Sequence, residues 1–272
     1  DVNLKYARLS NLGIEKERVV YNELVQGQPG FSFIQLALED REHLPELFRK
    51  TKIDIVCNLA AQAGVRYSME QPLVYMDANV VGFVNLLECM RYHDIKKLVY
   101  ASSSSVYGNS DTVPFSTDDS VDKPISIYAA TKKTNELIAY TYSHLFGIQT
   151  IGLRFFTVYG PWGRPDMAMF LFTDAILNGQ PIRLFNHGDL SRDFTYIDDI
   201  VNGVAATLSR ENASQYALYN IGNSKPVKLL DFVTEIEHAT GRTAIKEMHP
   251  MQAGDVVRTW ADTSHLARDY NY

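Results

Sequence analysis

The chain has 272 residues, of which 46% are apolar and 21% charged, an ordinary composition for one large domain or two smaller ones. Its net charge of −6 is spread without a basic block, so nucleic acid is not an expected partner. No uninterrupted apolar run approaches the roughly 20 residues of a membrane span, and the first residues are unlike a signal peptide, so we expect no membrane partner.

Strand-length apolar runs alternate with helical patterns along the first half of the chain. Strands are predicted at 31–38, 53–60, 96–104 and 149–156, and helices at 41–51, 71–93 and 126–147. Continuous apolar strands separated by helices indicate right-handed crossovers and a parallel sheet covered on both faces. The fold class is therefore α/β with a doubly wound parallel sheet, whose ligands bind beyond the carboxyl ends of the strands.

After about Tyr159 the pattern changes to short strands mixed with helices. The strands are predicted at 181–186, 192–197 and 217–222, and the helices near 167–178, 198–209 and 228–240. We interpret this as a smaller α/β lobe at the ligand end of the sheet. The expected division is 1–158 for the first domain and 159–272 mainly for the second, with some segments returning to the first.

Cysteine and histidine usage argues against a metal centre. Cys57 and Cys89 lie far apart among apolar neighbours, which favours a reducing cytoplasm over a disulfide framework. The seven histidines are scattered, so neither a structural zinc nor a histidine triad is expected.

Three strand ends are candidates for ligand binding. Small residues at 58–64 would let a ligand approach the backbone, although tight strand–helix packing explains them equally well. Four serines at 102–105 need hydrogen-bond partners if buried and could contact a substrate hydroxyl. In the third, 154–167, Arg154 could form a structural ion pair, while Arg164 sits in a turn suited to binding an anion through its planar fork.

Tyr128 and Lys132 are one helical turn apart on the same face of a predicted helix. Free tyrosine has a pKa of about 10 and is a poor base at neutral pH. Nearby positive charge stabilises the phenolate, and lowering its pKa by about three, roughly 4 kcal/mol, would make it a working base. We expect Lys132 to supply part of that charge.

These motifs, in this order, resemble the extended short-chain dehydrogenase/reductase superfamily of Rossmann-type, NAD-dependent nucleotide-sugar epimerases. The run "TVYGPWGRPDM", Thr157 to Met167, is more specifically similar to the UDP-glucuronate 4-epimerases. The resemblance covers nearly the whole chain. It implies bound NAD, a UDP-sugar substrate held by the second lobe, and a homodimer paired through helices at about 72–93 and 126–146.

The resemblance assigns roles residue by residue. The catalytic residues are Tyr128, Lys132 and Ser103. The NAD contacts are Leu59, Ala60, Ala61, Asn79, Ser102, Tyr128, Lys132 and Phe155. The UDP-sugar contacts are Ser103, Ser104, Thr157, Arg164, Phe185, Arg192 and Arg258.

The chain departs from the family pattern in two places. Neither the first strand with its glycine-rich turn nor the ribose-binding acid precedes Asp1, and the chain stops short of the family's usual end, so we expect a part of a longer protein. Ala37 also stands where the family commonly has an aspartate near the adenine, and Asp40 lies three residues on.

The resemblance implies that Tyr128 takes the proton of the sugar 4-hydroxyl while C4 gives its hydride to NAD⁺, after which the 4-keto sugar turns over and is reduced from its other face. Oxidation of a uronate at C4 creates a β-keto acid, and Arg164 with Thr157 would hold its carboxylate against loss of CO₂.

Sugar 4,6-dehydratases and UDP-glucuronate decarboxylases place acids after the catalytic Ser/Thr, whereas this chain has Ser104 and Ser105. Alternatives are UDP-glucose 4-epimerase, UDP-glucuronate decarboxylase and, from another class, a non-catalytic dinucleotide-binding protein.

Overall fold

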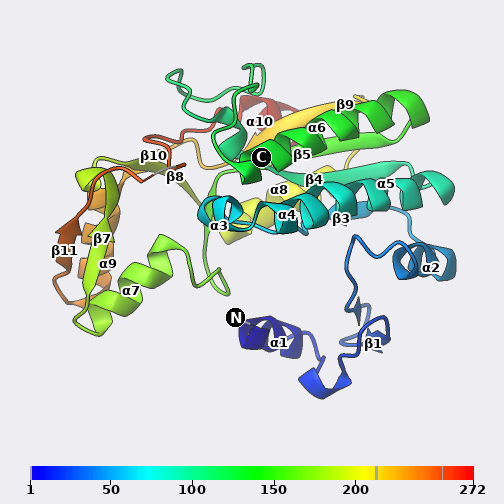
Figure 1. Cartoon of the computed structure of the whole chain (residues 1–272), viewed down its shortest axis with the longest axis horizontal. Helices are drawn as coiled ribbons and strands as arrows, with labels where there is room; N and C mark the ends of the chain where they lie inside the picture. The colour runs from blue at the N-terminus through cyan, green and yellow to red at the C-terminus, as the bar shows by residue number, and fades with distance from the viewer. Residues whose placement is uncertain (1, 212–213, 253) are drawn as a thin grey trace.

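A computed structural model describes residues 2–211, 214–252 and 254–272, and a parallel four-stranded sheet forms its centre (Figure 1). In spatial order the strands are β3 (Val56–Asn58), β4 (Lys97–Ser103), β5 (Gln149–Phe155) and β9 (Tyr216–Ile221). Successive residues of β4 are fully buried on opposite faces, which explains why the strand is apolar throughout. The predicted doubly wound α/β class is confirmed.

Helices cover both faces of this sheet (Figure 1). Leu98 and Tyr100 of β4 pack with α2 (His43–Lys50), α5 (Gly82–Tyr92) and α6 (Ile127–Phe146). On the opposite face, Val99 packs with residues of α8 (Ile197–Ser209) and α10 (Ser264–Tyr270).

The predicted helix at 71–93 is divided by one stretch of π-helix. It consists of α4 (Pro72–Tyr75), the π-helical residues Met76–Val81, and α5. By length and composition alone, Pro72–Tyr92 could cross a membrane, but 44% of its most apolar window is buried inside this protein. Its packing against the sheet is that of a core helix.

The smaller lobe lies at one end of the sheet (Figure 1). One of its sheets has the order β10-β8-β6, and β7 pairs in parallel with β11 in a second. Two helices cover the second pair and share an apolar core with it. The elements are β6 (Thr157–Tyr159), α7 (Ala168–Leu177), β7 (Pro181–Leu184), β8 (Ser191–Tyr196), β10 (Pro226–Lys228), α9 (Leu229–Thr240) and β11 (Ile245–Met248).

Two predicted strands pair differently from what the sequence pattern indicates. The strand at 217–222, grouped with the smaller lobe, is β9 and pairs with β5 in the central sheet. The strand at 31–38 shrinks to β2 (Ser32–Ile34), which pairs antiparallel with β1 (Leu24–Gln26) outside that sheet. Leu36 and Leu38 instead pack against the core beside α5, so burial of side chains rather than strand pairing fixes that segment.

The N-terminal helix α1 (Val2–Ser10) lies apart from the sheet, near the β1–β2 hairpin (Figure 1). All nine residues of α1 are described, and none of them is buried. A further short helix, α3 (Val65–Glu70), follows the loop after β3.

Candidate functional site

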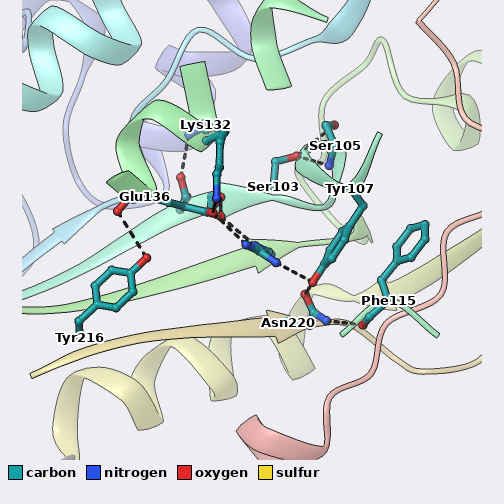
Figure 2. Close-up of polar contacts among 12 residues, drawn as sticks. Ser103, Ser105, Tyr107, Phe115, Lys132, Glu136, Tyr216 and Asn220 are labelled. Carbon is teal, nitrogen blue, oxygen red and sulfur yellow. Dashed lines mark hydrogen bonds and ion pairs between the residues drawn. The ribbon is translucent and has the colours of Figure 1, made fainter. Parts of the chain in front are cut away.

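The N-terminus of α6 brings Tyr128 and Lys132 against the ends of the central strands. Ser126 caps the helix by accepting a hydrogen bond from the backbone N–H of Ala129 at 3.1 Å, which fixes where the first turn begins. One turn after Tyr128, the Nζ of the buried Lys132 donates to the carbonyl of Ala101 in β4 at 2.7 Å (Figure 2). The helix register therefore anchors the lysine to β4.

Burial raises the pKa of Tyr128, and two neighbouring groups act against that shift. Burial is the largest influence and leaves the pKa above 10, while a hydrogen bond with the Ser103 side chain and the charge of Arg164 act to lower it. Lys132, which the helical spacing predicts for this role, is not among the groups that shift the pKa of Tyr128 in this structure. Burial also lowers the pKa of Lys132 to about 8. A fully depressed tyrosine pKa stays a prediction for the ligand-loaded enzyme.

The four serines at the end of β4 differ in what their side chains contact. Ser103 ends β4 and caps the next 3-10 turn, its hydroxyl oxygen accepting from the backbone N–H of Ser105 at 3.2 Å (Figure 2). Ser102 instead turns into the core and donates to Glu136 at 2.6 Å, so its hydroxyl is committed to the fold. Ser104 and Ser105 face a cavity.

That cavity has a volume of about 150 Å³ and separates the strand ends from the C-terminal segment. Predicted substrate residues Ser104, Thr157 and Arg192 line it together. Arg258 instead lines a neighbouring, larger cavity of about 740 Å³. The two cavities share Ile125 and the residues 254–256.

The loop after β3 is fixed by a buried asparagine. Asn79 accepts from the backbone N–H of Gln62 at 2.7 Å and donates to the Gln62 carbonyl at 3.0 Å. Within this loop Leu59 and Ala60 remain exposed, and Ala61 is half-buried. The predicted NAD contacts in this region are therefore an accessible loop, Leu59 to Ala61, and the side chain of Asn79, which fixes that loop.

Tyr75 also organises this region and was not identified from the sequence. Its hydroxyl donates toward the carbonyls of Ala63, at 3.0 Å, and Gly64, at 2.7 Å. Its ring meets that of Tyr128 edge-on, with centroids 6.2 Å apart. No sequence motif marks it, because the contact depends on how α4 crosses α6.

A buried polar network lies beneath the strand ends (Figure 2). The carboxylate of Glu136 accepts from Arg154 at 2.8 and 2.9 Å, and both residues are about 1% exposed. Arg154 also donates to the Tyr107 hydroxyl at 3.0 Å, which donates to Asn220 at 2.7 Å. The structural ion pair considered for Arg154 is thereby confirmed. Glu136 lies four residues after Lys132, and that helical spacing is the signal that could have revealed it.

Electrostatics within this network favours the charged arginine. Burial alone would lower the pKa of Arg154, but the hydrogen bonds and charge of Glu136 raise it well above its ordinary value. Arg154 therefore stays protonated despite its burial.

Arginines of the third strand end and the smaller lobe are held by local partners. Arg164 forms an ion pair with Asp166 that includes a hydrogen bond of 3.1 Å. Arg192 donates to the carbonyls of Ser191 at 2.9 Å and Val257 at 3.1 Å, and burial lowers its pKa.

Phe185 and Phe155 occupy different surroundings. Phe185 lies beneath the guanidinium of Arg66, 4.9 Å from its ring centre. Phe155 ends β5 and is partly buried against the core on the α8 side of the sheet.

Asp40, three residues after Ala37, is engaged by several local donors. Its carboxylate accepts from the Tyr21 hydroxyl at 2.6 Å and lies 2.9 Å from His43 Nδ1. It also accepts from the backbone N–H groups of Glu42 and His43, capping α2. A carboxylate with this many donors serves the start of α2.

Comparison with known proteins gives a consistent result. The model of the NAD-dependent epimerase/dehydratase family matches residues 5–222. Protein CapI of Staphylococcus aureus is 49% identical, over 90% of this chain and 78% of its own length. A probable UDP-glucuronate 4-epimerase of Rhizobium meliloti is 46% identical, over 89% of this chain and 76% of its own length.

Solved structures agree with these relatives. The UDP-glucuronic acid 4-epimerase of Bacillus cereus, in complex with UDP-glucuronic acid and NAD, is 30% identical and superimposes with a TM-score of 0.86, covering all of this chain and 81% of its own. MoeE5 in complex with UDP-glucuronic acid and NAD is 32% identical with a TM-score of 0.81, covering 88% and 80%. This chain is a member of the NAD-dependent epimerase/dehydratase family.

Proposed function

We propose that the protein interconverts UDP-glucuronate and UDP-galacturonate by 4-epimerisation, using bound NAD. The observation that carries the proposal is the position of Tyr128 at the ends of the central strands. Its ring meets that of Tyr75 with centroids 6.2 Å apart, and Lys132 one turn on is anchored to β4. Ser103 and Arg164 are the groups that act to lower the pKa of Tyr128. A base beside a hydroxyl donor suits removal of a proton from a sugar hydroxyl. An arginine at the same place suits a substrate that carries a carboxylate.

The residues present fit the nicotinamide half of NAD. The loop at Leu59 and Ala60 is exposed and is held by Asn79. The Nζ of Lys132, a residue of α6, lies close by, at the carbonyl of Ala101 in β4. Lys132 and Tyr128 would hold the nicotinamide ribose, and the loop after β3 would lie against the cofactor. When bound, NAD accepts a hydride from C4 of the sugar and returns it to the other face.

The protein's own residues supply the proton chemistry. Tyr128 accepts the proton of the 4-hydroxyl and gives it back after the sugar has turned, while Ser103 holds the same oxygen. Arg164 and Thr157 hold the C6 carboxylate. Loss of CO₂ requires the C5–C6 bond to align with the π system of the C4 ketone, and a carboxylate held in place keeps that bond out of alignment. Ser104 and Ser105 cannot act as the acids that dehydratases and decarboxylases use at this position.

The division of the chain follows from the same proposal. Residues 1–158 would mainly hold NAD and 159–272 mainly the UDP-sugar, with Arg192, Arg258 and Phe185 on the UDP side. The pairing of β9 with β5 and the packing of α8 and α10 return part of the second segment to the central sheet. Both cysteines are free, which accords with the cytoplasm as the compartment.

A homodimer is part of the proposal. The outer faces of α4 to α6 carry exposed apolar side chains, among them Leu73 at 75% and Leu137 at 57%. Apolar area of this kind on two adjacent helices is suited to pairing with a second copy. Light scattering of the full-length protein at micromolar concentration should give twice the chain mass, and a monomer would contradict it.

The direct test is product analysis with full-length, NAD-loaded enzyme. UDP-glucuronate should yield UDP-galacturonate without pentose product, and a preference for UDP-glucose would overturn the uronate assignment. Tyr128→Phe should lower turnover by at least the 10²–10⁴-fold typical of a lost general base, while UDP-sugar binding stays within a few-fold. Tyr140→Phe removes the same hydroxyl from an exposed position of α6 and serves as the matched control. Near-normal turnover in Tyr128→Phe would refute the catalytic assignment.

A further inference from the structure

The turn that carries Arg164 has an unusual backbone. Trp162 has φ of +61°, a left-handed conformation that non-glycine side chains rarely adopt, and Gly160 has φ of +142°. Gly163 is packed so closely that an added Cβ would lie 2.5 Å from the Phe170 ring. A turn with this geometry depends on contacts that hold it in place.

One such contact comes from α1, more than 150 residues earlier in the chain. The guanidinium of Arg8 donates to the carbonyl of Trp162 and, at 3.3 Å, to the carbonyl of Gly163. These two carbonyls immediately precede Arg164. This polar contact joins α1, none of whose residues is fully buried, to the turn.

The position of Arg164 matters to the catalytic tyrosine. A Cβ added to Gly64 would lie 3.6 Å from the Arg164 guanidinium, which places that group against the loop after β3. Its charge acts on both Tyr128 and Tyr75. A shift of the preceding carbonyls would move the fork relative to the tyrosine, and displacements of about 1 Å can lower rates 10²-fold.

We infer that Arg8 is a positioning residue for uronate recognition: from α1 it clamps the 162–163 carbonyls and thereby aims the Arg164 fork at the substrate carboxylate. The inference rests on the proposed function, since it requires a carboxylate-bearing sugar. It gives α1 a part in substrate selection although α1 itself lies outside the catalytic set.

The test separates carboxylate recognition from binding of the UDP portion. Full-length, NAD-loaded Arg8→Ala should raise KM for UDP-glucuronate about 10-fold and release detectable pentose product, while the Kd for UDP stays within 2-fold. Arg8→Lys keeps the charge but has a single donor nitrogen in place of the guanidinium fork, and should fall between Arg8→Ala and the wild type. Lys5→Ala removes a positive charge from an exposed position one turn earlier in α1 and should change neither constant.

Several outcomes would overturn the inference. Unchanged KM in Arg8→Ala, or a parallel loss of UDP and UDP-glucuronate affinity, would reduce Arg8 to a structural contact. If Arg8→Ala lowers Tm markedly, the same split between the two affinities is measured in Arg8→Lys. Turnover of UDP-glucuronate by the wild type is established first, so failure of the proposed function is distinguished from failure of the Arg8 inference.

Discussion

The polar groups beneath the strand ends and those of the turn at 160–166 differ in burial and in how fully they are paired. Glu136 and Arg154 are almost completely buried, and Ser102 and Tyr107 complete their hydrogen bonding. Arg164 and Asp166 form a similar pair on the surface, with side chains 43% and 62% exposed. The buried pair is closed to solvent, whereas the guanidinium of the exposed pair is accessible to a ligand carboxylate.

Glu136→Gln should have the largest effect on this comparison. It leaves the Arg154 charge buried without a counterion, and breaking a buried pair in this way typically lowers stability by about 3–5 kcal/mol. Urea unfolding measures the loss. Glu46→Gln makes the same substitution in a surface pair with Lys50 and should lower stability by less than about 1 kcal/mol. Equal losses in the two variants would remove the distinction between buried and exposed pairs.

Arg164→Ala tests whether the exposed arginine acts on a ligand. Affinity for UDP-glucuronate should fall by the 1.5–3 kcal/mol typical of a charged hydrogen bond, with little change in stability. Residual turnover should leak pentose product or free NADH, because the carboxylate is no longer held. Mass spectrometry measures the products, and a variant that is merely slower, without decarboxylated product, would remove this role from Arg164.

Lys132 provides a pH-dependent measure of burial at the site. Its folded pKa of about 8 lies below the ordinary 10.5, so between these values the unfolded chain retains a proton that the folded protein has lost. The free energy of unfolding should therefore rise with pH through this window. Below pH 8 the full cost of burying the charged Lys132 should be present.

In NAD-free protein, the stability difference between wild type and Lys132→Met should shift in favour of the wild type by about 2 kcal/mol from pH 7 to pH 9.5. Taking the difference cancels the titration of the buried tyrosines. Denaturant unfolding at the two pH values measures it, and a pH-independent difference would show that Lys132 is not significantly desolvated.

Asp166→Asn should have the smallest effect on stability, within about 1 kcal/mol, because its pair with Arg164 is exposed to solvent. UDP-glucuronate affinity should rise a few-fold, since the substrate carboxylate would no longer compete with Asp166 for the arginine fork. Thermal unfolding and KM measure the two effects. A stability loss as large as that of Glu136→Gln would mean that the exposed pair is also a structural one.

Local sequence patterns were sufficient for three neighbouring strands of the parallel sheet, β3, β4 and β5, and for placing Ser103, Tyr128 and Lys132 at its edge. The apolar run of β4 reports burial on both faces, and helical periodicity places Tyr128 above Lys132 without further information. The carboxyl ends of parallel strands share one edge, so residues that follow them converge. The membership of β9 in the central sheet could not be read in this way, because its pairing with β5 spans more than 60 residues.

The sequence by itself determined the fold class and the position of most core elements along the chain, because both depend on short-range spacing and on the alternation of apolar residues. The catalytic roles of Ser103, Tyr128 and Lys132 rest on the family resemblance and stay a prediction. Only the tertiary structure decided which polar side chains form their hydrogen bonds inside the core. Ser102 and Ser103 are adjacent and chemically identical, yet one bonds Glu136 in the core and the other faces Tyr128. Likewise, the contact of Arg8 with the Trp162 carbonyl joins segments 154 residues apart. Such pairings follow from how whole elements pack, and no local pattern encodes them.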